Sequence, residues 1–313
     1  MTISRDDIDR AAHRIAPHVR RTPVIDVRLD GFALPVTLKL ELLQHTGSFK
    51  PRGAFNNLLG LDSQGHGVAA ASGGNHGAAV AYAAKMLGHR ATIFVPGISS
   101  PAKVARIASY GAEIVQKGAN YHEALAICEA HVAATGAFGI HAYDAETTLA
   151  GQGTLAREFA DQAPDLDTLL VAVGGGGLIG GIAAWYQQSV KVVGVEPETC
   201  QALHAAFAAG KPVTIKPSGV AADSLGASSV GGMMFPVAQS HVSHVALVSD
   251  GAIGDAQRYL WRTAQLVSEP GGAAALAALL SGAYRPEKDE RVGVVVCGGN
   301  TPLEVFGQLF QMT

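Results

Sequence analysis

The segment GSFKPRGA places a lysine, Lys50, between an aromatic residue and a proline. Beside the apolar ring of Phe49, a lysine amine loses part of its hydration, and desolvation favours the uncharged amine that acts as a nucleophile. Pro51 suits the first turn of a helix, so Lys50 is expected at a helix start. The pattern indicates a lysine that forms a Schiff base with an aldehyde. The alternative is a helix-start lysine whose charge stays in water.

Three glycine-rich loops, SGGNHG (72–77), GGGGLIGG (174–181) and CGGNTP (297–302), each follow an apolar strand pattern and precede a helix pattern. This order places all three at the carboxyl ends of strands, where α/β proteins bind ligands. The four consecutive glycines 174–177 can direct backbone N–H groups and the positive end of the next helix at a phosphate. The alternative is a tight turn that only packs closely, although four consecutive glycines cost much backbone entropy.

A dinucleotide site is a second interpretation of the tetraglycine loop. Gly175, Gly177 and Gly180 satisfy the pattern G-x-G-x-x-G, and Glu196 ends the next strand at about the spacing of a ribose-binding acid. An NAD-binding oxidoreductase therefore remains an alternative from a different class. It explains neither Lys50 nor the other two glycine-rich loops.

The elements around these loops alternate between strand and helix patterns, which predicts an α/β fold. We expect two open, twisted, parallel-sheet domains with a cofactor cleft between them. The predicted small domain on the substrate side is 67–143, and the predicted large domain comprises 1–66 and 144–313. The stretch 210–243, rich in Gly, Pro and Ser, is expected to be irregular. The predicted strands are 67–72, 91–96, 112–117, 167–174, 191–197, 244–250 and 291–299.

The composition excludes several classes of protein. Of 313 residues, 48% are hydrophobic and 16% charged, which is enough apolar surface for a sizeable core. The net charge is −3 without a dense basic tract, so neither nucleic acid nor a membrane is an expected partner. The three cysteines lie far apart and the N-terminus lacks an apolar signal core, which favours the cytoplasm.

Five motifs, GSFKPRGA, SGGNHG, GGGGLIGG, EPGGA and CGGN, occur in this order over nearly the whole chain. Together they resemble the fold-type II pyridoxal 5'-phosphate (PLP) enzymes of the threonine/serine dehydratase and serine racemase family, with a tryptophan synthase β-like fold. The resemblance implies a homodimeric lyase of amino-acid catabolism. It implies elimination from a β-hydroxy amino acid such as L-threonine or L-serine, giving a 2-oxo acid and ammonia. A phenylserine or 3-hydroxyaspartate dehydratase and an amino-acid racemase remain alternatives.

The resemblance also implies roles for single residues. Lys50 would bind PLP covalently and act as the catalytic base, and Phe49 would pack against the cofactor ring. Asn75 would hydrogen-bond the ring hydroxyl, and Cys297 would face the pyridine nitrogen as a neutral thiol. The phosphate would be held by Gly174, Gly175, Gly176 and Gly177. The substrate carboxylate would be surrounded by Ser72, Gly73, Gly74, Asn75 and His76.

Two positions depart from the racemases of the family. Gly73 stands where they have a second serine that delivers a proton from the opposite face, so racemisation is disfavoured. Glu196 matches one of their metal-binding acids, but Ala202 replaces the aspartate, so no metal site is predicted. Glu196 is then either a weak cation ligand or a strand-end acid in solvent. Because the chain ends soon after CGGN, no regulatory domain is expected.

Overall fold

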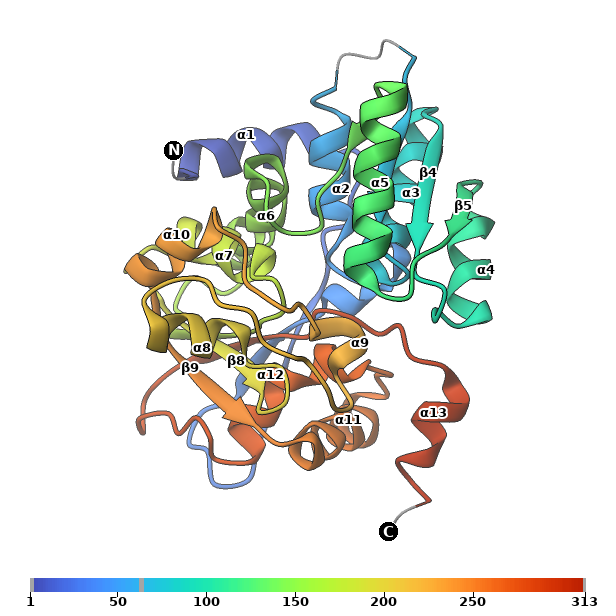
Figure 1. Ribbon diagram of the computed structural model, residues 1–313. Helices are drawn as coiled ribbons and strands as arrows, with labels where there is room; N and C mark the ends of the chain where they lie inside the picture. Colours follow the sequence, from blue (N-terminus) through green and yellow to red (C-terminus); the bar gives the residue numbers. More distant parts are fainter. Residues whose placement is uncertain (1–2, 62–64, 312–313) are drawn as a thin grey trace.

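The computed structural model describes residues 3–61 and 65–311, which form two sheets of mainly parallel strands (Figure 1). The larger sheet has six strands, and only its edge pair β1–β2 is antiparallel. Its last strand in sequence, β10, lies between β2 and β7. In spatial order the strands are β1 (Val24–Val27), β2 (Val36–Lys39), β10 (Val292–Val295), β7 (Thr168–Ala172), β8 (Lys191–Pro197) and β9 (Val242–Val248).

The smaller sheet has four strands, all parallel. All of them lie within 67–143, whereas the strands of the larger sheet lie outside that range. The predicted α/β class with two parallel sheets is confirmed, and the exact domain boundaries remain a prediction. In spatial order the strands are β5 (Glu113–Gln116), β4 (Ala91–Val95), β3 (Val68–Ala71) and β6 (Phe138–Gly139).

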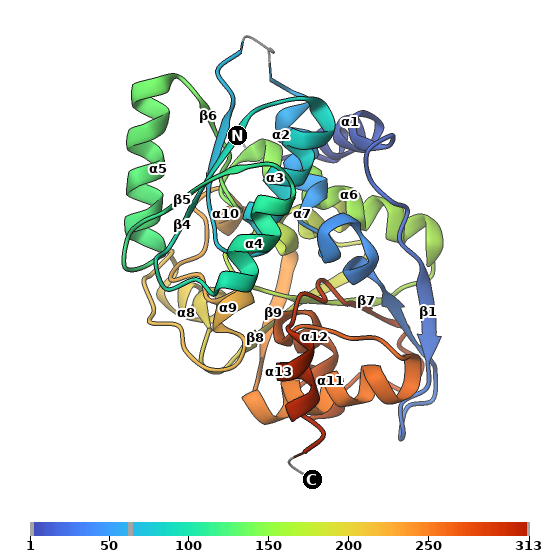
Figure 2. The ribbon, with the colours of Figure 1, turned by 90° about the vertical axis from the view of Figure 1, so that its right-hand side faces the viewer.

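Helices cover both sheets, and Figures 1 and 2 show α3, α4 and α5 grouped around the smaller one. The first helices are α1 (Arg5–Ile15), α2 (Pro51–Leu58), α3 (Asn75–Leu87), α4 (Pro101–Ser109), α5 (Tyr121–Thr135), α6 (Glu146–Gln162) and α7 (Gly177–Tyr186). The others are α8 (Ala202–Ala209), α9 (Ala222–Leu225), α10 (Met234–His241), α11 (Asp250–Ala264), α12 (Pro270–Leu280) and α13 (Leu303–Gln308).

Helix ends follow from local sequence signals. The Asn120 side chain accepts a hydrogen bond from the backbone N–H of Glu123, which starts α5, and Gly136 ends that helix with φ 72°. Pro51 opens α2, so Lys50 occupies the N-cap position of that helix, as the sequence predicts. The backbone of Lys50 is therefore held in place by the start of α2.

Two expectations about the secondary structure were wrong. The stretch 210–243 contains α9 and α10, and Gly231, Gly232 and Pro236 hide the helical pattern of α10. The final strand is shorter than the predicted 291–299. It ends at Val295, and the residues after it hydrogen-bond to Lys39 at the end of β2 and to the segment between β2 and Lys50.

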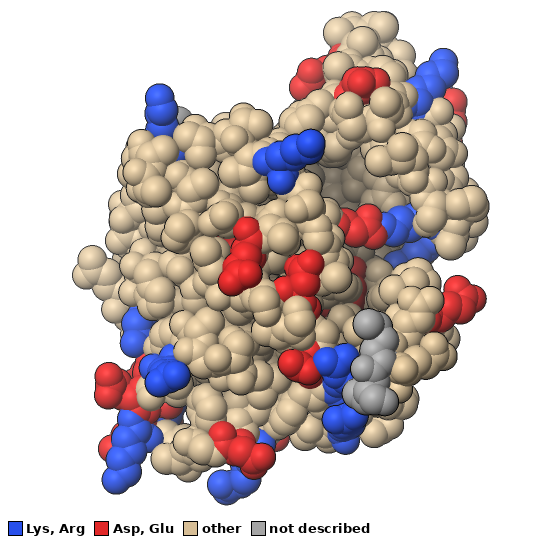
Figure 3. Space-filling model, turned by 60° about the horizontal axis from the view of Figure 1, so that its bottom comes forward, with Lys and Arg blue, Asp and Glu red and all other residues tan. Residues whose placement is uncertain are grey.

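The core has one large apolar cluster around the six-stranded sheet and two smaller ones around the four-stranded sheet. On the face in Figure 3, lysine and arginine side chains are interspersed with aspartate and glutamate, so no broad field of one sign appears there. Among the described residues, no helix combines the length and the apolar character needed to cross a membrane.

Candidate active site

The amine of Lys50 lies partly buried, with its Nζ 3.0 Å from the backbone oxygen of Ala142. It also lies 5.0 Å from the centre of the Phe49 ring. Burial lowers the pKa of Lys50 to about 8, although the acidic groups of Cys297 and Glu269 raise it. The amine is therefore closer to its uncharged, nucleophilic form than an ordinary lysine.

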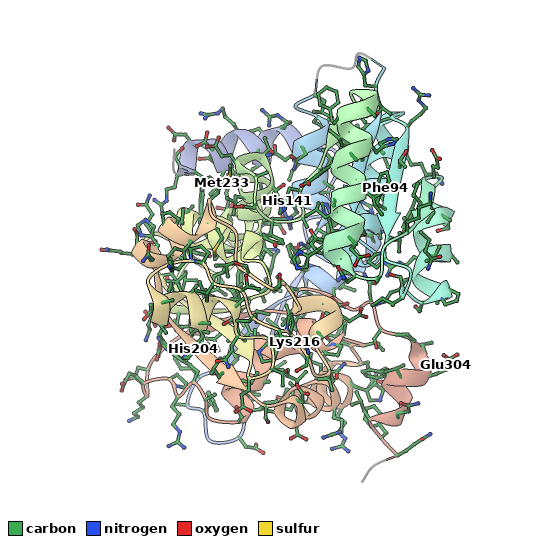
Figure 4. The ribbon with its side chains drawn as sticks, viewed as in Figure 1. Phe94, His141, His204, Lys216, Met233 and Glu304 are labelled. Carbon is green, nitrogen blue, oxygen red and sulfur yellow. The ribbon has the colours of Figure 1, made fainter. Side chains whose placement is uncertain are left out.

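The carbonyl that faces Lys50 belongs to a tight turn after β6. The Nδ1 of His141 accepts a hydrogen bond from the backbone N–H of Asp144 at 2.8 Å, and the His141 carbonyl accepts one from Thr148 at 3.0 Å. Figure 4 shows His141 between α5 and α6, where the two halves of the molecule meet. The turn fixes the position of the Ala142 oxygen relative to the amine.

The loop after β10 holds the segment that precedes Lys50. The backbone N–H of Phe49 donates to the oxygen of Cys297 at 3.1 Å, and Ser48 forms an isolated bridge with Gly298. This pairing brings Lys50 and Cys297, 247 positions apart in the sequence (297 − 50), into one site. Burial raises the pKa of the Cys297 thiol, and the nearby Glu269 raises it further, so the thiol is neutral.

Asn75, the first residue of α3, has both ends of its amide in hydrogen bonds. Its Nδ2 donates to Oε1 of Glu269 at 2.7 Å, and its Oδ1 accepts from Nδ2 of Asn300 at 2.6 Å. Burial raises the pKa of Glu269 to about 7, while the hydrogen bond from Asn75 lowers it. Asn75 of the motif SGGNHG and Glu269 of the motif EPGGA thus come together at the edge of the cleft.

A small cavity of about 40 Å³ opens beside this pair. The cavity lies between the half of the molecule around the four-stranded sheet and the half around the six-stranded sheet. Charged groups of both signs line it. Lys103 of α4 forms an ion pair with Asp223 of α9 across the cleft. The lining is formed by Gly73, Gly74, Asn75, Ala78, Lys103, Arg106, Ile107, Asp223, Glu269 and Asn300.

The tetraglycine loop is shaped by close packing. A Cβ at Gly175 would overlap the ring of Tyr143, and a Cβ at Gly177 would lie 2.9 Å from the Tyr143 backbone. Gly176 has φ 91°, a left-handed value that disfavours other residues. The close-packing interpretation of these glycines therefore applies. A phosphate role is compatible with it, because the first N–H groups of α7 have no partner within the helix.

The side chains of Ser72 and His76 form hydrogen bonds to different parts of the backbone. The Ser72 hydroxyl accepts a hydrogen bond from the backbone N–H of Gly74 at 3.1 Å, which shapes the loop before α3. The His76 ring donates to the backbone oxygen of Ile140 at 2.9 Å and is buried. Burial lowers the pKa of His76 to about 3, and the charge of Lys50 lowers it further. His76 is therefore a neutral residue that joins α3 to the segment after β6.

Glu196 is fully buried, so its interpretation as a strand-end acid in solvent was wrong. Its two carboxylate oxygens accept hydrogen bonds from the backbone N–H groups of Leu203 and His204, at 2.8 and 2.9 Å. Burial raises the pKa of Glu196 to about 7. These bonds occupy the carboxylate that a dinucleotide ribose would need. No group of three or more His, Cys, Asp or Glu suited to a metal ion occurs in 3–61 and 65–311.

A buried charge cluster supports the lysine segment, and sequence analysis missed it. Arg52 donates to both oxygens of Glu41, at 2.7 and 2.8 Å, and to Glu158 at 3.0 Å. The Nζ of Lys39 forms an ion pair with Glu158 at 2.5 Å. Although burial opposes ionisation, the Arg52 charge holds the pKa of Glu41 below its usual value. The arginine of KPRGA is thus a structural residue that anchors α2.

Asn300, Tyr143 and Arg106 are the other site residues that the sequence did not reveal. Asn300 lies within the quoted motif CGGN, which could have marked it. Tyr143 and Arg106 carry no local signal, because their contacts with Gly175 and with Thr46 arise only in the folded chain.

Known proteins resemble this chain over almost its full length. The sequence model of the family described as "Pyridoxal-phosphate dependent enzyme" matches residues 15–298. A phenylserine dehydratase from Ralstonia pickettii is 38% identical over 305 residues, which cover 94% of this chain and 92% of the relative. A catabolic L-threonine dehydratase from Staphylococcus aureus is 35% identical over 311 residues, which cover 96% and 90%.

A solved structure also resembles this chain over almost its full length. Maize serine racemase has a TM-score of 0.93 and 34% sequence identity to this chain. The match covers 99% of this chain and 98% of the maize chain.

Proposed function

This chain belongs to the family of pyridoxal-phosphate dependent enzymes, and from that premise we propose that it is an ammonia-lyase for β-hydroxy amino acids. It converts L-threonine or L-serine to a 2-oxo acid and ammonia. The observation that carries the proposal is the Lys50 amine, which is partly buried and has a pKa lowered to about 8. The names of the dehydratases from Ralstonia pickettii and Staphylococcus aureus support it.

The residues of the site fit pyridoxal phosphate. Lys50 offers an amine for its aldehyde, and Phe49 offers an apolar face beside that amine. The glycines 174–177 leave no room for side chains at a helix start, which suits a phosphate. Asn75 would hold the ring oxygen, and the neutral Cys297 thiol would face the ring nitrogen. When bound, pyridoxal phosphate supplies an aldehyde and a conjugated ring that withdraws electrons from the substrate Cα.

Lys50 acts as the base of the reaction. Its amine, once free, takes the proton from the substrate Cα, and a pKa of about 8 keeps part of the amine uncharged near neutral pH. The Cβ–O bond then breaks, and the hydroxyl leaves as water after it gains a proton. Water converts the released enamine into the 2-oxo acid and ammonia. Backbone groups of the loop from Ser72 to His76 hold the substrate carboxylate at the start of α3.

The lining of the cavity favours a small polar substrate. Lys103, Arg106 and Asp223 surround it, and such charged groups suit the hydroxyl side chains of serine and threonine better than a phenyl ring. Phenylserine is the second candidate substrate, because the Ralstonia relative is a phenylserine dehydratase. A racemase is disfavoured because Gly73 carries no proton-donating side chain.

The assembly and location follow from the same family resemblance. We infer a homodimer in the cytoplasm, and the three buried free cysteines are consistent with a reducing compartment. Sedimentation of the purified enzyme tests the dimer, and a monomer at assay concentration would contradict it.

Two measurements on the same protein test the proposed function. Borohydride reduction followed by peptide mass mapping should place the cofactor on the fragment that contains Lys50. A panel of serine, threonine, phenylserine and 3-hydroxyaspartate should show the fastest oxo-acid release from serine or threonine. A tag on another lysine overturns the role of Lys50. A faster reaction with phenylserine overturns the substrate assignment alone.

A further inference from the structure

A chain of side-chain hydrogen bonds crosses the site from the segment before Lys50 to the start of α12. The Nδ2 of Asn300 donates to the backbone oxygen of Thr46 at 2.8 Å and to Oδ1 of Asn75 at 2.6 Å. Asn75 in turn donates through its Nδ2 to Glu269 at 2.7 Å. Four separate segments of the chain therefore meet at two amide groups.

The Thr46 carbonyl at one end of this series of hydrogen bonds determines which way each amide points. The Thr46 carbonyl can only accept, so the Asn300 atom beside it must be the nitrogen. Both hydrogens of that nitrogen are then used, one on Thr46 and one on Asn75, so the Asn75 atom facing Asn300 is its oxygen. The Asn75 nitrogen consequently faces the carboxylate of Glu269, which accepts as well. The Thr46 end of the hydrogen-bond chain therefore sets the orientation of Asn75, and Oε1 of Glu269 accepts from Asn75 in that orientation.

The backbone around Thr46 is held in an unusual conformation that presents this carbonyl. Thr46 has φ 58° and Gly47 has φ 67°, both in the left-handed region. A Cβ at Gly47 would overlap the amide of Asn300, so the glycine allows the close approach. The guanidinium of Arg106 donates to the same Thr46 oxygen at 2.5 Å. A left-handed conformation is costly for a residue other than glycine and persists only where the surrounding structure holds it.

We propose that Asn300 is a positioning residue that makes Asn75 a hydrogen-bond donor toward the cofactor. The Asn75 nitrogen has two hydrogens, and Glu269 takes one of them. In the proposed arrangement the second points into the cavity that Asn75, Glu269 and Asn300 all line. A donor at this point stabilises the ring oxygen of pyridoxal phosphate in its deprotonated form. The inference rests on the contact of Asn75 with the cofactor in the proposed function.

The variant Asn300→Asp tests the inference because it replaces the donor by a group of the same shape that only accepts. The carboxylate would face two oxygens, those of Thr46 and Asn75, and Asn75 would have to turn. We expect the visible absorption band of the cofactor-loaded enzyme to fall by about tenfold relative to the near-ultraviolet band, the factor for one lost hydrogen bond. Asn300→Ser, which keeps one donor, should show a smaller change and serves if the aspartate variant does not fold.

Asn57→Asp is the matched control. The Nδ2 of Asn57 also donates to a backbone oxygen, that of Gly53, at 2.7 Å, and to a side-chain oxygen, that of Thr148, at 2.9 Å. It is buried, and neither of these hydrogen bonds involves Asn75. Its replacement should lower the unfolding midpoint and leave the ratio of the two bands unchanged. Equal band changes in Asn57→Asp and Asn300→Asp would mean that Asn300 is merely structural.

Asn75→Ala separates the inference from the proposed function. If Asn75→Ala changes the band ratio but Asn300→Asp does not, the positioning role of Asn300 is wrong and the cofactor contact of Asn75 stands. If Asn75→Ala leaves the ratio unchanged, the cofactor contact itself is wrong and the inference falls with it. A change in both, without one in Asn57→Asp, supports the inference.

Discussion

Both carboxylate oxygens of Glu41 accept hydrogen bonds from the guanidinium of Arg52, at 2.7 and 2.8 Å. Neither side chain is exposed by more than 1%. Since Arg52 stands two residues after Lys50, this ion pair anchors the first turn of α2 close to the amine.

Removing the cation from this pair should destabilise the protein strongly. Arg52→Met leaves the buried charge of Glu41 without the guanidinium that pairs with it, whereas Glu158 keeps its pair with Lys39. Such an uncompensated buried charge costs about 3–5 kcal/mol of unfolding free energy. Urea unfolding of the purified variant measures it. Arg291→Met is the control, because its pair with Asp165 spans 3.8 Å at the surface. We expect a change within about 0.5 kcal/mol there. Similar losses in both variants would contradict the structural role of Arg52.

The raised pKa of Glu269 should make stability depend on pH in the acid range. The folded protein keeps the proton up to about pH 7, whereas the unfolded chain releases it near its ordinary value. The stability from this group is therefore present at low pH and is lost as the pH rises toward about 7. In Glu269→Gln, we expect the loss of on the order of 3 kcal/mol between about pH 4.5 and about pH 7 to disappear.

Urea unfolding at several pH values checks this expectation. The exposed Glu304, which Figure 4 labels on α13, provides the control variant Glu304→Gln. That variant should keep the pH profile of the unmodified protein. Parallel profiles for the unmodified protein and Glu269→Gln would show that Glu269 titrates normally.

Adding one methyl group to the tetraglycine loop should weaken cofactor binding. In Gly175→Ala the new Cβ overlaps the Tyr143 ring, and relieving such overpacking costs about 1–3 kcal/mol. Titration with pyridoxal phosphate, followed by absorbance, measures the affinity. Gly307→Ala, where no heavy atom lies within 4 Å of the new Cβ, should bind the cofactor normally. Undiminished affinity in Gly175→Ala would place the phosphate elsewhere.

A proton donor at position 73 should open a route to racemisation. In Gly73→Ser, however, the new Cβ overlaps the Ser99 hydroxyl, so we expect the gain only with Ser99→Gly in the same chain. The measurement is the amount of D-serine formed from L-serine. Gly73→Ala with Ser99→Gly is the control without a proton donor. If the serine and alanine variants form equal amounts of D-serine, Gly73 does not explain the reaction specificity.

The sequence predicted the alternating elements and the three glycine-rich loops because these features arise from neighbouring residues. Gly88 and Gly136, for example, end α3 and α5 in the left-handed conformation that local sequence signals indicate. It failed at α10, where glycines and a proline suggested an irregular chain. Packing against the tetraglycine loop supports this helix, since Met234 contacts Gly176 and Gly180.

The sequence also could not predict which groups the polar side chains of the site would contact. Asn75 and Asn300 are 225 residues apart, and neither residue type specifies which atom it will contact. Glu41 and Glu158 are ordinary surface residues by type, and only the fold buries them around Arg52. The resemblance to a family gave a role to Asn75 without giving the residues that hold it.

The strand β10 forms near the end of the chain, yet it lies between β2 and β7 in the larger sheet. During synthesis on the ribosome, the residues before Val292 are made first, so β2 and β7 exist before the strand that lies between them. Phe49 and Ser48 then lack the partners, Cys297 and Gly298, that hold the lysine segment in place. We therefore expect the lysine segment to reach its final position, and with it the affinity for pyridoxal phosphate, only after this last strand has formed.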